Sequence, residues 1–106
     1  MSISERRAEQ AIENLASTDE AYAQAKSLTK GLEYRLKVCK AIAFLGASGT
    51  VAEKEAAALS SAEYIEILDE YQSAMLDMET LGAKRKKEEL IWEHWRSVNA
   101  NRRAGG

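Results

Sequence analysis

The sequence predicts an all-α protein, an antiparallel helical hairpin that is coiled-coil-like and carries short accessory helices. Its 106 residues include no proline, and a composition of 45% apolar and 30% charged residues favours long uninterrupted helices. Apolar residues recur at alternating spacings of three and four in both halves of the chain, as in a coiled-coil seam. The tight interior cluster of turn formers, Gly46, Ser48 and Gly49, lies between these halves. The chain is therefore expected to reverse direction once, near its middle.

Capping patterns predict where the helices begin. Thr50 and Glu53 have the spacing of a capping box, in which the threonine hydroxyl accepts the amide three residues on, so a helix should begin at about Val51. The same spacing recurs at Ser17 with Glu20 and at Ser60 with Glu63. These signals predict a short N-terminal helix over residues 4–16 and further helices over residues 19–45, 51–58 and 61–99.

The apolar seam differs along the chain. In the first half it comprises Tyr22, Ala25, Thr29, Leu32, Leu36, Cys39 and Ala43, and in the second half Tyr64, Leu68, Tyr71, Met75 and Met78. The spacing stops at Gly82, and residues 82–89 contain no large apolar side chain. Trp92 and Trp95 then resume a strongly apolar face. Local breaks of this kind often mark functional regions.

Charge supports the hairpin register. In an antiparallel pair joined near residues 46–50, facing residue numbers should add up to about 106. This register puts Lys40 beside Glu66, and Lys37 beside Asp69 or Glu70. Extended further, it puts Trp92 beside Leu15 and Trp95 beside Ile12, so the N-terminal helix would cover the tryptophans. Exposed ion pairs add little to the stability of a fold. We therefore expect these charges to determine the register of the two helices more than the stability of the hairpin.

The predicted organisation is one helical-hairpin domain over residues 1–106, with flexible ends at residues 1–3 and 100–106. Two long helices bury less of their surface than a compact domain does. Small folds commonly compensate by pairing with another copy. We therefore expect a homo-oligomer whose copies complete one another's core.

A basic and aromatic segment is the candidate surface for a protein partner or a nucleic acid. It comprises Lys84, Arg85, Lys86, Lys87, Trp92, Trp95, Arg96, Arg102 and Arg103. Its basic side chains could meet phosphate or an acidic protein surface, and its indoles could stack on unpaired bases. The simpler interpretation is a solvated helix face beside two tryptophans that anchor the core.

Residue chemistry does not indicate an enzyme, a cofactor or a metal. His94 has no second histidine to act with, and Cys39 has no identifiable base. The carboxylates recur at helical spacing, without the Glu-x-x-His pairs of a bundle di-metal site. The net charge of -2 favours neither bulk binding of nucleic acid nor a polyacidic tail. One cysteine, with no signal region and no apolar run of membrane-spanning length, predicts a reducing cytoplasm and no membrane partner.

The sequence resembles small uncharacterised early-region proteins of tailed bacteriophages. The resemblance rests on Leu32-Glu33-Tyr34-Arg35-Leu36-Lys37, Ala43-Phe44-Leu45, Gly49-Thr50-Val51-Ala52-Glu53-Lys54-Glu55-Ala56, Ser61-Ala62-Glu63-Tyr64 and Trp95-Arg96-Ser97-Val98-Asn99-Ala100. Such proteins tend to be encoded near recombinases that anneal single strands and near single-strand DNA-binding proteins. The resemblance implies expression in a bacterial host cytoplasm and, by gene neighbourhood, an accessory role in phage DNA recombination or replication. It implies no catalytic residue.

Three functions follow from these observations. The preferred hypothesis is a non-enzymatic interaction protein that docks onto a phage or host recombination or replication protein through the basic and aromatic segment. The first alternative is an accessory protein that binds single-stranded DNA directly through the same residues. The second alternative is a structural or virion-assembly spacer.

Overall fold

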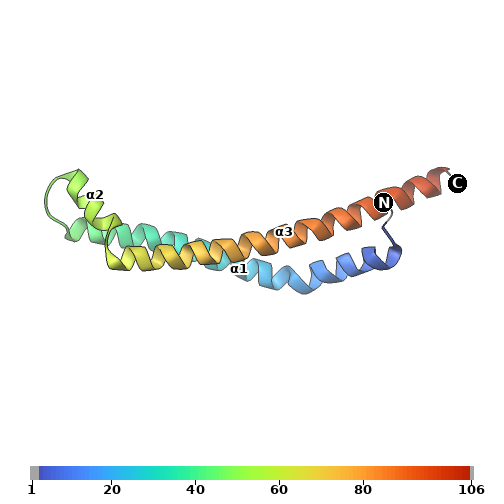
Figure 1. Cartoon of the computed structure of the whole chain (residues 1–106), viewed down its shortest axis with the longest axis horizontal. Coiled ribbons are helices and arrows are strands. Elements are labelled where there is room, and N and C mark those ends of the chain that lie inside the picture. The colour runs from blue at the N-terminus through green and yellow to red at the C-terminus, as the bar shows by residue number, and fades with distance from the viewer. Residues whose placement is uncertain (1–2, 106) are drawn as a thin grey trace. The chain divides into compact units, whose positions relative to one another are not determined.

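The computed structural model describes residues 3–105 and contains two long helices and one short helix (Figure 1). Helix α1 spans Glu5–Gly46, α2 spans Val51–Leu59 and α3 spans Ala62–Gly105. Helices α1 and α3 pack antiparallel, because late residues of α1 contact early residues of α3 and the reverse also holds. The all-α hairpin predicted from the sequence is confirmed. The flexible ends predicted at Met1, Ser2 and Gly106 lie outside the described residues.

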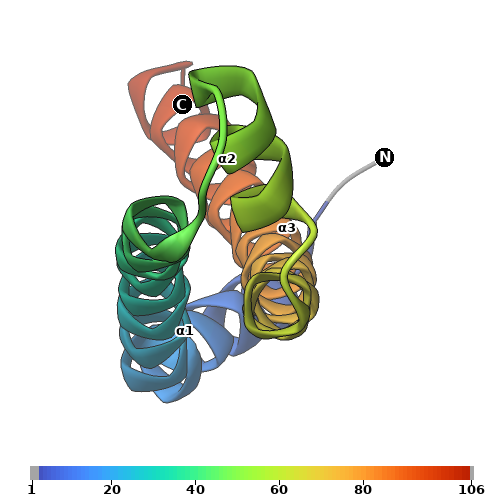
Figure 2. The ribbon, with the colours of Figure 1, turned by 90° about the vertical axis from the view of Figure 1, so that its left-hand side faces the viewer.

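The turn between the long helices has the predicted chemistry. Helix α1 ends at Gly46, and Gly49 has a φ of 110°, in the left-handed region that favours glycine. A Cβ atom at Gly49 would lie 2.6 Å from a carboxylate oxygen of Glu53, so a side chain there would displace this carboxylate in addition to straining the backbone. The Glu53 amide donates a hydrogen bond of 3.2 Å to the Thr50 hydroxyl, as expected for the cap of α2. Figure 2 shows α2 following this turn and leading into α3.

Two predicted helix starts differ from the structure. The break predicted between residues 16 and 19 is wrong, because α1 continues through it and no separate N-terminal helix forms. The hydroxyls of Ser17 and Thr18 donate to the Asn14 carbonyl within the helix, at 3.1 and 2.8 Å, so neither caps a new one. The cap of α3 is Ser61, whose hydroxyl accepts the Tyr64 amide, while Ser60 ends α2. Helix α3 also continues past the predicted end at residue 99.

The hairpin consists of two compact units. Unit 1 comprises residues 1–23 and 79–106, and unit 2 comprises residues 24–78. Each unit contains one stretch of α1 and one stretch of α3, and unit 2 also contains α2 and the turn.

Unit 2 holds the apolar core. Its buried members are Leu32, Leu36, Cys39, Ile67 and Ala74, with Tyr64, Leu68 and Tyr71 packed against them. The α1 seam is the predicted one, and the buried Thr29 hydroxyl is satisfied by the Ala25 carbonyl at 2.8 Å. On α3, Ile67 and Ala74 are buried where the prediction placed Leu68 and Met75, which are half-buried. The predicted seam residues of α3 therefore still meet α1, but the centre of the contact face lies slightly nearer to Ile67 and Ala74.

The charges of unit 2 pair differently from the prediction. Lys40 contacts Glu55 of α2 at 3.2 Å, where Glu66 of α3 was predicted. Glu70 lies 3.8 Å from Arg35, where Lys37 was predicted. The register is nevertheless close to the predicted one, because Arg35 and Lys37 lie within one turn of each other. All four paired side chains are more than two-fifths exposed, so these ion pairs stabilise the fold little.

Candidate functional site

The seam of unit 1 continues through the segment that lacks large apolar side chains. On α3, Leu81, Arg85, Glu88, Trp92 and Trp95 keep the alternating spacing of four and three, and all are half-buried. The break predicted at Gly82 is therefore a change of chemistry in an unbroken seam. Two ionisable side chains occupy positions that are normally apolar.

Arg85 points into this seam and is held by α1. Its guanidinium donates to the Leu15 carbonyl at 2.9 Å, to the Thr18 hydroxyl at 2.7 Å and to Asp19 at 2.5 Å. It also lies over the Tyr22 ring, 5.2 Å from the ring centre. A Cβ atom on Gly82 would lie 3.3 Å from the Tyr22 hydroxyl, so the glycine leaves room for this ring.

Glu88 forms the second polar contact of the seam. Its carboxylate accepts hydrogen bonds from Arg7 at 2.8 and 3.1 Å and from the Asn14 amide at 2.9 Å. Gln10 donates to the Asn14 side-chain oxygen and so orients that amide. Burial works to raise the pKa of Glu88, but the hydrogen bonds from Asn14 and Arg7, with the charges of Arg7 and Lys87, outweigh it and lower the pKa.

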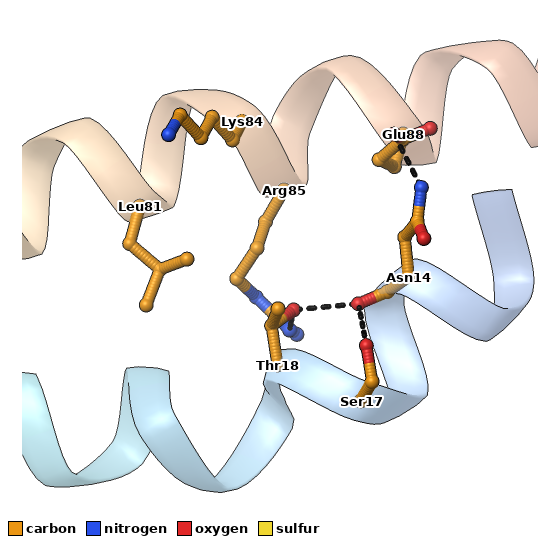
Figure 3. Close-up of a pocket in the computed structure, with 7 residues that line it drawn as sticks. All are labelled: Asn14, Ser17, Thr18, Leu81, Lys84, Arg85 and Glu88. Carbon is orange, nitrogen blue, oxygen red and sulfur yellow. Dashed lines mark hydrogen bonds between the residues drawn. The ribbon is translucent and has the colours of Figure 1, made fainter.

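These contacts form a polar layer, defined here as Arg7, Asn14, Thr18, Asp19, Arg85 and Glu88. Figure 3 shows the hollow beside it, where the α3 side chains of Arg85 and Glu88 meet Thr18 and Asn14 of α1. The Arg85 and Glu88 side chains are only 17% and 15% exposed. The charges of Arg85 and Glu88 are satisfied by their own chain, which suits a layer that fixes the pairing of two helices. One buried nitrogen, Nη1 of Arg7, has no hydrogen-bond partner among residues 3–105.

The tryptophans close the far end of unit 1. Their rings stack with centres 5.5 Å apart, and both are half-buried. Leu15 lines a hollow together with Trp92, as predicted. The spacing that follows from the contact between Asn14 and Glu88 puts Trp92 level with Ala11 and Trp95 level with Ala8, both completely buried. Ile12, which was predicted to cover Trp95, is 39% exposed, whereas the two alanines at these levels are buried.

The other predicted surface residues lie outside the seam. Lys84, Lys86, Lys87, Arg96, Arg102 and Arg103 are exposed. Lys86 lies 3.5 Å from Glu89, and Arg96 lies 3.7 Å from Glu93, both along the helix. Arg85 is the exception, because its guanidinium is engaged inside the seam.

An apolar hollow lies among these basic residues. It is lined by Ile3, Ala83, Lys86, Lys87, Leu90, Ile91 and His94, and is called the basic hollow here. Leu90 is 58% exposed and Ile91 is half-buried, so the hollow offers apolar surface with lysines at its edge. Sequence reasoning selected the lysines but gave Leu90 and Ile91 no role in the surface.

The remaining features of the described part of the chain concern metal ligands, the thiol and membrane spans. Residues 3–105 contain no group of three or more histidine, cysteine, aspartate or glutamate side chains arranged to hold a metal ion. Cys39 is a free thiol in the core of unit 2, 8% exposed. Among these residues no helix combines the length and apolar character needed to span a bilayer.

The fold and the site define a two-helix hairpin whose seam changes from apolar to polar. The chain matches no protein-family model, no curated protein and no solved structure. Sequence reasoning missed Arg7, Asn14 and Glu88 as partners of the seam. The signal for Glu88 was present, because the seven-residue repeat continues from Met78 through Leu81 to Glu88 if charged residues are allowed in it, whereas Arg7 and Asn14 lie on the other long helix and had no such signal.

Proposed function

We propose that the chain is a non-enzymatic interaction protein, accessory to bacteriophage DNA recombination or replication, that acts by docking a protein partner. The observation that carries the docking is the basic hollow, where the exposed side chain of Leu90 lies beside Lys86 and Lys87. An apolar surface edged by positive charge suits an acidic partner segment that carries apolar side chains. The assignment to phage DNA recombination or replication is supported only by the sequence resemblance.

The test compares binding to the full chain with binding to a variant of this surface. A fluorescent peptide of alternating acidic and large apolar residues is the probe, and anisotropy is the measurement. We expect the triple variant Lys86→Ala, Lys87→Ala and Leu90→Ser to lose binding. The variant Leu76→Ser is the matched control, because Leu76 is similarly exposed but lies in unit 2. Equal binding by all three proteins would contradict the proposal.

A second experiment addresses the process. Tagged wild-type chain and the triple variant are used for affinity capture from infected cells, followed by mass spectrometry. We expect a recombination or replication protein to be captured by the wild type and lost with the variant. Recovery of the chain in purified virus particles, with no such partner, would favour the structural spacer instead.

Direct binding of single-stranded DNA is the alternative that the exposed basic residues support. Binding through phosphates would weaken steeply with salt and would disappear in the variant Lys84→Glu with Lys86→Glu. Stacking of bases would also quench the fluorescence of the indoles, although Trp92 and Trp95 already stack on each other. Absence of binding to an oligothymidine at low salt would eliminate this alternative.

A further inference from the structure

Helix α1 carries a second apolar stripe in unit 2 that does not face α3. Its exposed members are Leu28, Tyr34, Val38, Ile42 and Leu45, called the outer α1 face here. All of them except Tyr34 fit a second seven-residue repeat, beside the repeat that forms the core. A helix with two such repeats is suited to pack against two neighbours.

Unit 2 does not complete a core by itself. Among residues 3–105 no large side chain is fully buried, and the best-covered large apolar residues of unit 2 are Leu32 and Ile67, each 5% exposed. Four-helix bundles pack their helices around one shared core. The outer α1 face supplies the apolar surface that a larger bundle would bury.

Gly31 lies in the middle of this face. A Cβ atom at Gly31 would meet no other atom within 4 Å, so the chain's own packing does not require a glycine there. Glycine inside a helix lowers its stability relative to alanine. Close approach of a second helix backbone at this point would account for the residue.

Charges of opposite sign lie along the two edges of the outer α1 face. The contact between Arg35 and Glu70 brings the acidic side of α3 to one edge, and Glu63 and Glu66 share the spacing of Glu70. Helical geometry puts Lys30 and Lys37 at the other edge. Within residues 3–105, no side-chain hydrogen bond or ion pair shorter than 4.0 Å engages Lys37, Glu63 or Glu66.

We propose that the outer α1 face of one chain packs against the same face of a second copy, with the two α1 helices parallel. A two-fold axis along the helices sets the acidic edge of each copy against the basic edge of the other. An antiparallel pair would set acidic against acidic and basic against basic. The charges therefore select the parallel arrangement, in which unit 2 of both copies forms one bundle of long helices.

The first test asks whether dimerisation depends on the outer α1 face or on any exposed apolar side chain. Ile42 is 65% exposed on the outer α1 face, and Leu76 is 66% exposed on α3 of the same unit. Light scattering on the full-length chain should give a dimer for the wild type and for Leu76→Ser. Ile42→Ser should weaken association by about tenfold or more. A monomeric wild type, or an equal response of both variants, would overturn the proposal.

A charge exchange tests the edges. One variant carries Lys30→Glu and Lys37→Glu, and the other carries Glu66→Lys and Glu70→Lys. Each alone should associate more weakly than the wild type, because like charges then meet across the interface. A mixture in equal amounts should recover a mixed dimer, because both edges are again complementary. Circular dichroism confirms that each variant is helical, and failure of the folded mixture to associate more tightly than its components excludes this pairing.

Crosslinking tests the orientation. In a parallel pair, residue 28 of one copy lies against residue 28 of the second copy, so a Leu28→Cys chain should form a disulfide-linked dimer under mild oxidation. The wild-type chain is the control, because its Cys39 is buried in the core. An antiparallel pair would bring residue 28 close to residue 45, and then only a mixture of Leu28→Cys and Leu45→Cys chains would crosslink. That result would refute the parallel pairing.

Discussion

Unit 1 and unit 2 use the same helix pairing with different chemistry. In unit 2 the seam contains Leu32, Leu36 and Ile67, which are stabilised by removing apolar surface from water. In unit 1 the corresponding positions of α3 include Arg85 and Glu88, which are stabilised by hydrogen bonds to α1. The comparison shows that a seven-residue repeat can specify which face of α3 packs on α1 even where the side chains of that face are not apolar.

The two chemistries should stabilise the units unequally. A polar layer adds less net stability than an apolar layer, because its groups lose their hydration when they pair. The polar layer does, however, raise the free energy of every helix register that would leave one of its charges buried without a partner. We therefore expect unit 2 to supply most of the stability and unit 1 to supply more of the specificity of pairing, with earlier hydrogen exchange of the amides in unit 1.

The largest expected effect is in unit 2. Leu32→Ala should lower the free energy of unfolding by about 2–5 kcal/mol, because it removes a buried side chain and leaves a cavity. Denaturant unfolding followed by circular dichroism measures it. Ser27→Ala, at an exposed position of the same helix, should stay within about 0.5 kcal/mol of the wild type. An unchanged stability of Leu32→Ala would refute the observed seam.

The next effect is in unit 1. Arg85→Ala removes the bonds to Leu15, Thr18 and Asp19 and should cost about 1–3 kcal/mol. Its neighbour Lys84 is exposed, so Lys84→Ala should be nearly neutral. Hydrogen exchange should show the loss of protection mainly in unit 1. If unit 2 lost protection equally, the units would unfold together and the comparison would fail.

A smaller effect is expected at the turn of unit 2. Thr50→Ala removes the hydroxyl that accepts the Glu53 amide and should cost about 1 kcal/mol. Thermal unfolding measures the loss, and Ser48→Ala, an exposed turn residue outside the cap, is the matched substitution. A Thr50→Ala chain as stable as Ser48→Ala would mean that the cap does not stabilise α2.

The smallest effect is the pH dependence of unit 1. Because the pKa of Glu88 is lowered in the folded chain, its ionised form contributes stability above the ordinary value of 4.5, and this contribution is lost as pH falls through the lowered pKa. The difference in unfolding free energy between the wild type and Glu88→Gln should therefore be present at neutral pH and shrink in acid. A difference that stayed constant down to acid pH would assign the effect to packing.

Much of this fold could be predicted from the sequence. The absence of proline, the repeat through Leu32 and Leu36, and the glycines at the turn each act locally, so they indicate helices and a reversal. The continuity of α1 at Ser17 could not be predicted in this way, because a serine can cap a helix or bond back into one, and packing on α3 decides between them. The roles of Arg85 and Glu88 depend on α1 partners that lie far away in sequence.

The positions of the tryptophans and of the cysteine allow each unit to be followed separately in solution. Both tryptophans of the chain lie in unit 1, and its single cysteine lies in the core of unit 2. Indole fluorescence therefore reports solvent reaching the first unit, and the rate at which a thiol reagent modifies Cys39 reports how often the second unit opens. An unaltered chain thus carries two separate probes, and a ligand that rigidifies only one unit should change the signal of that unit.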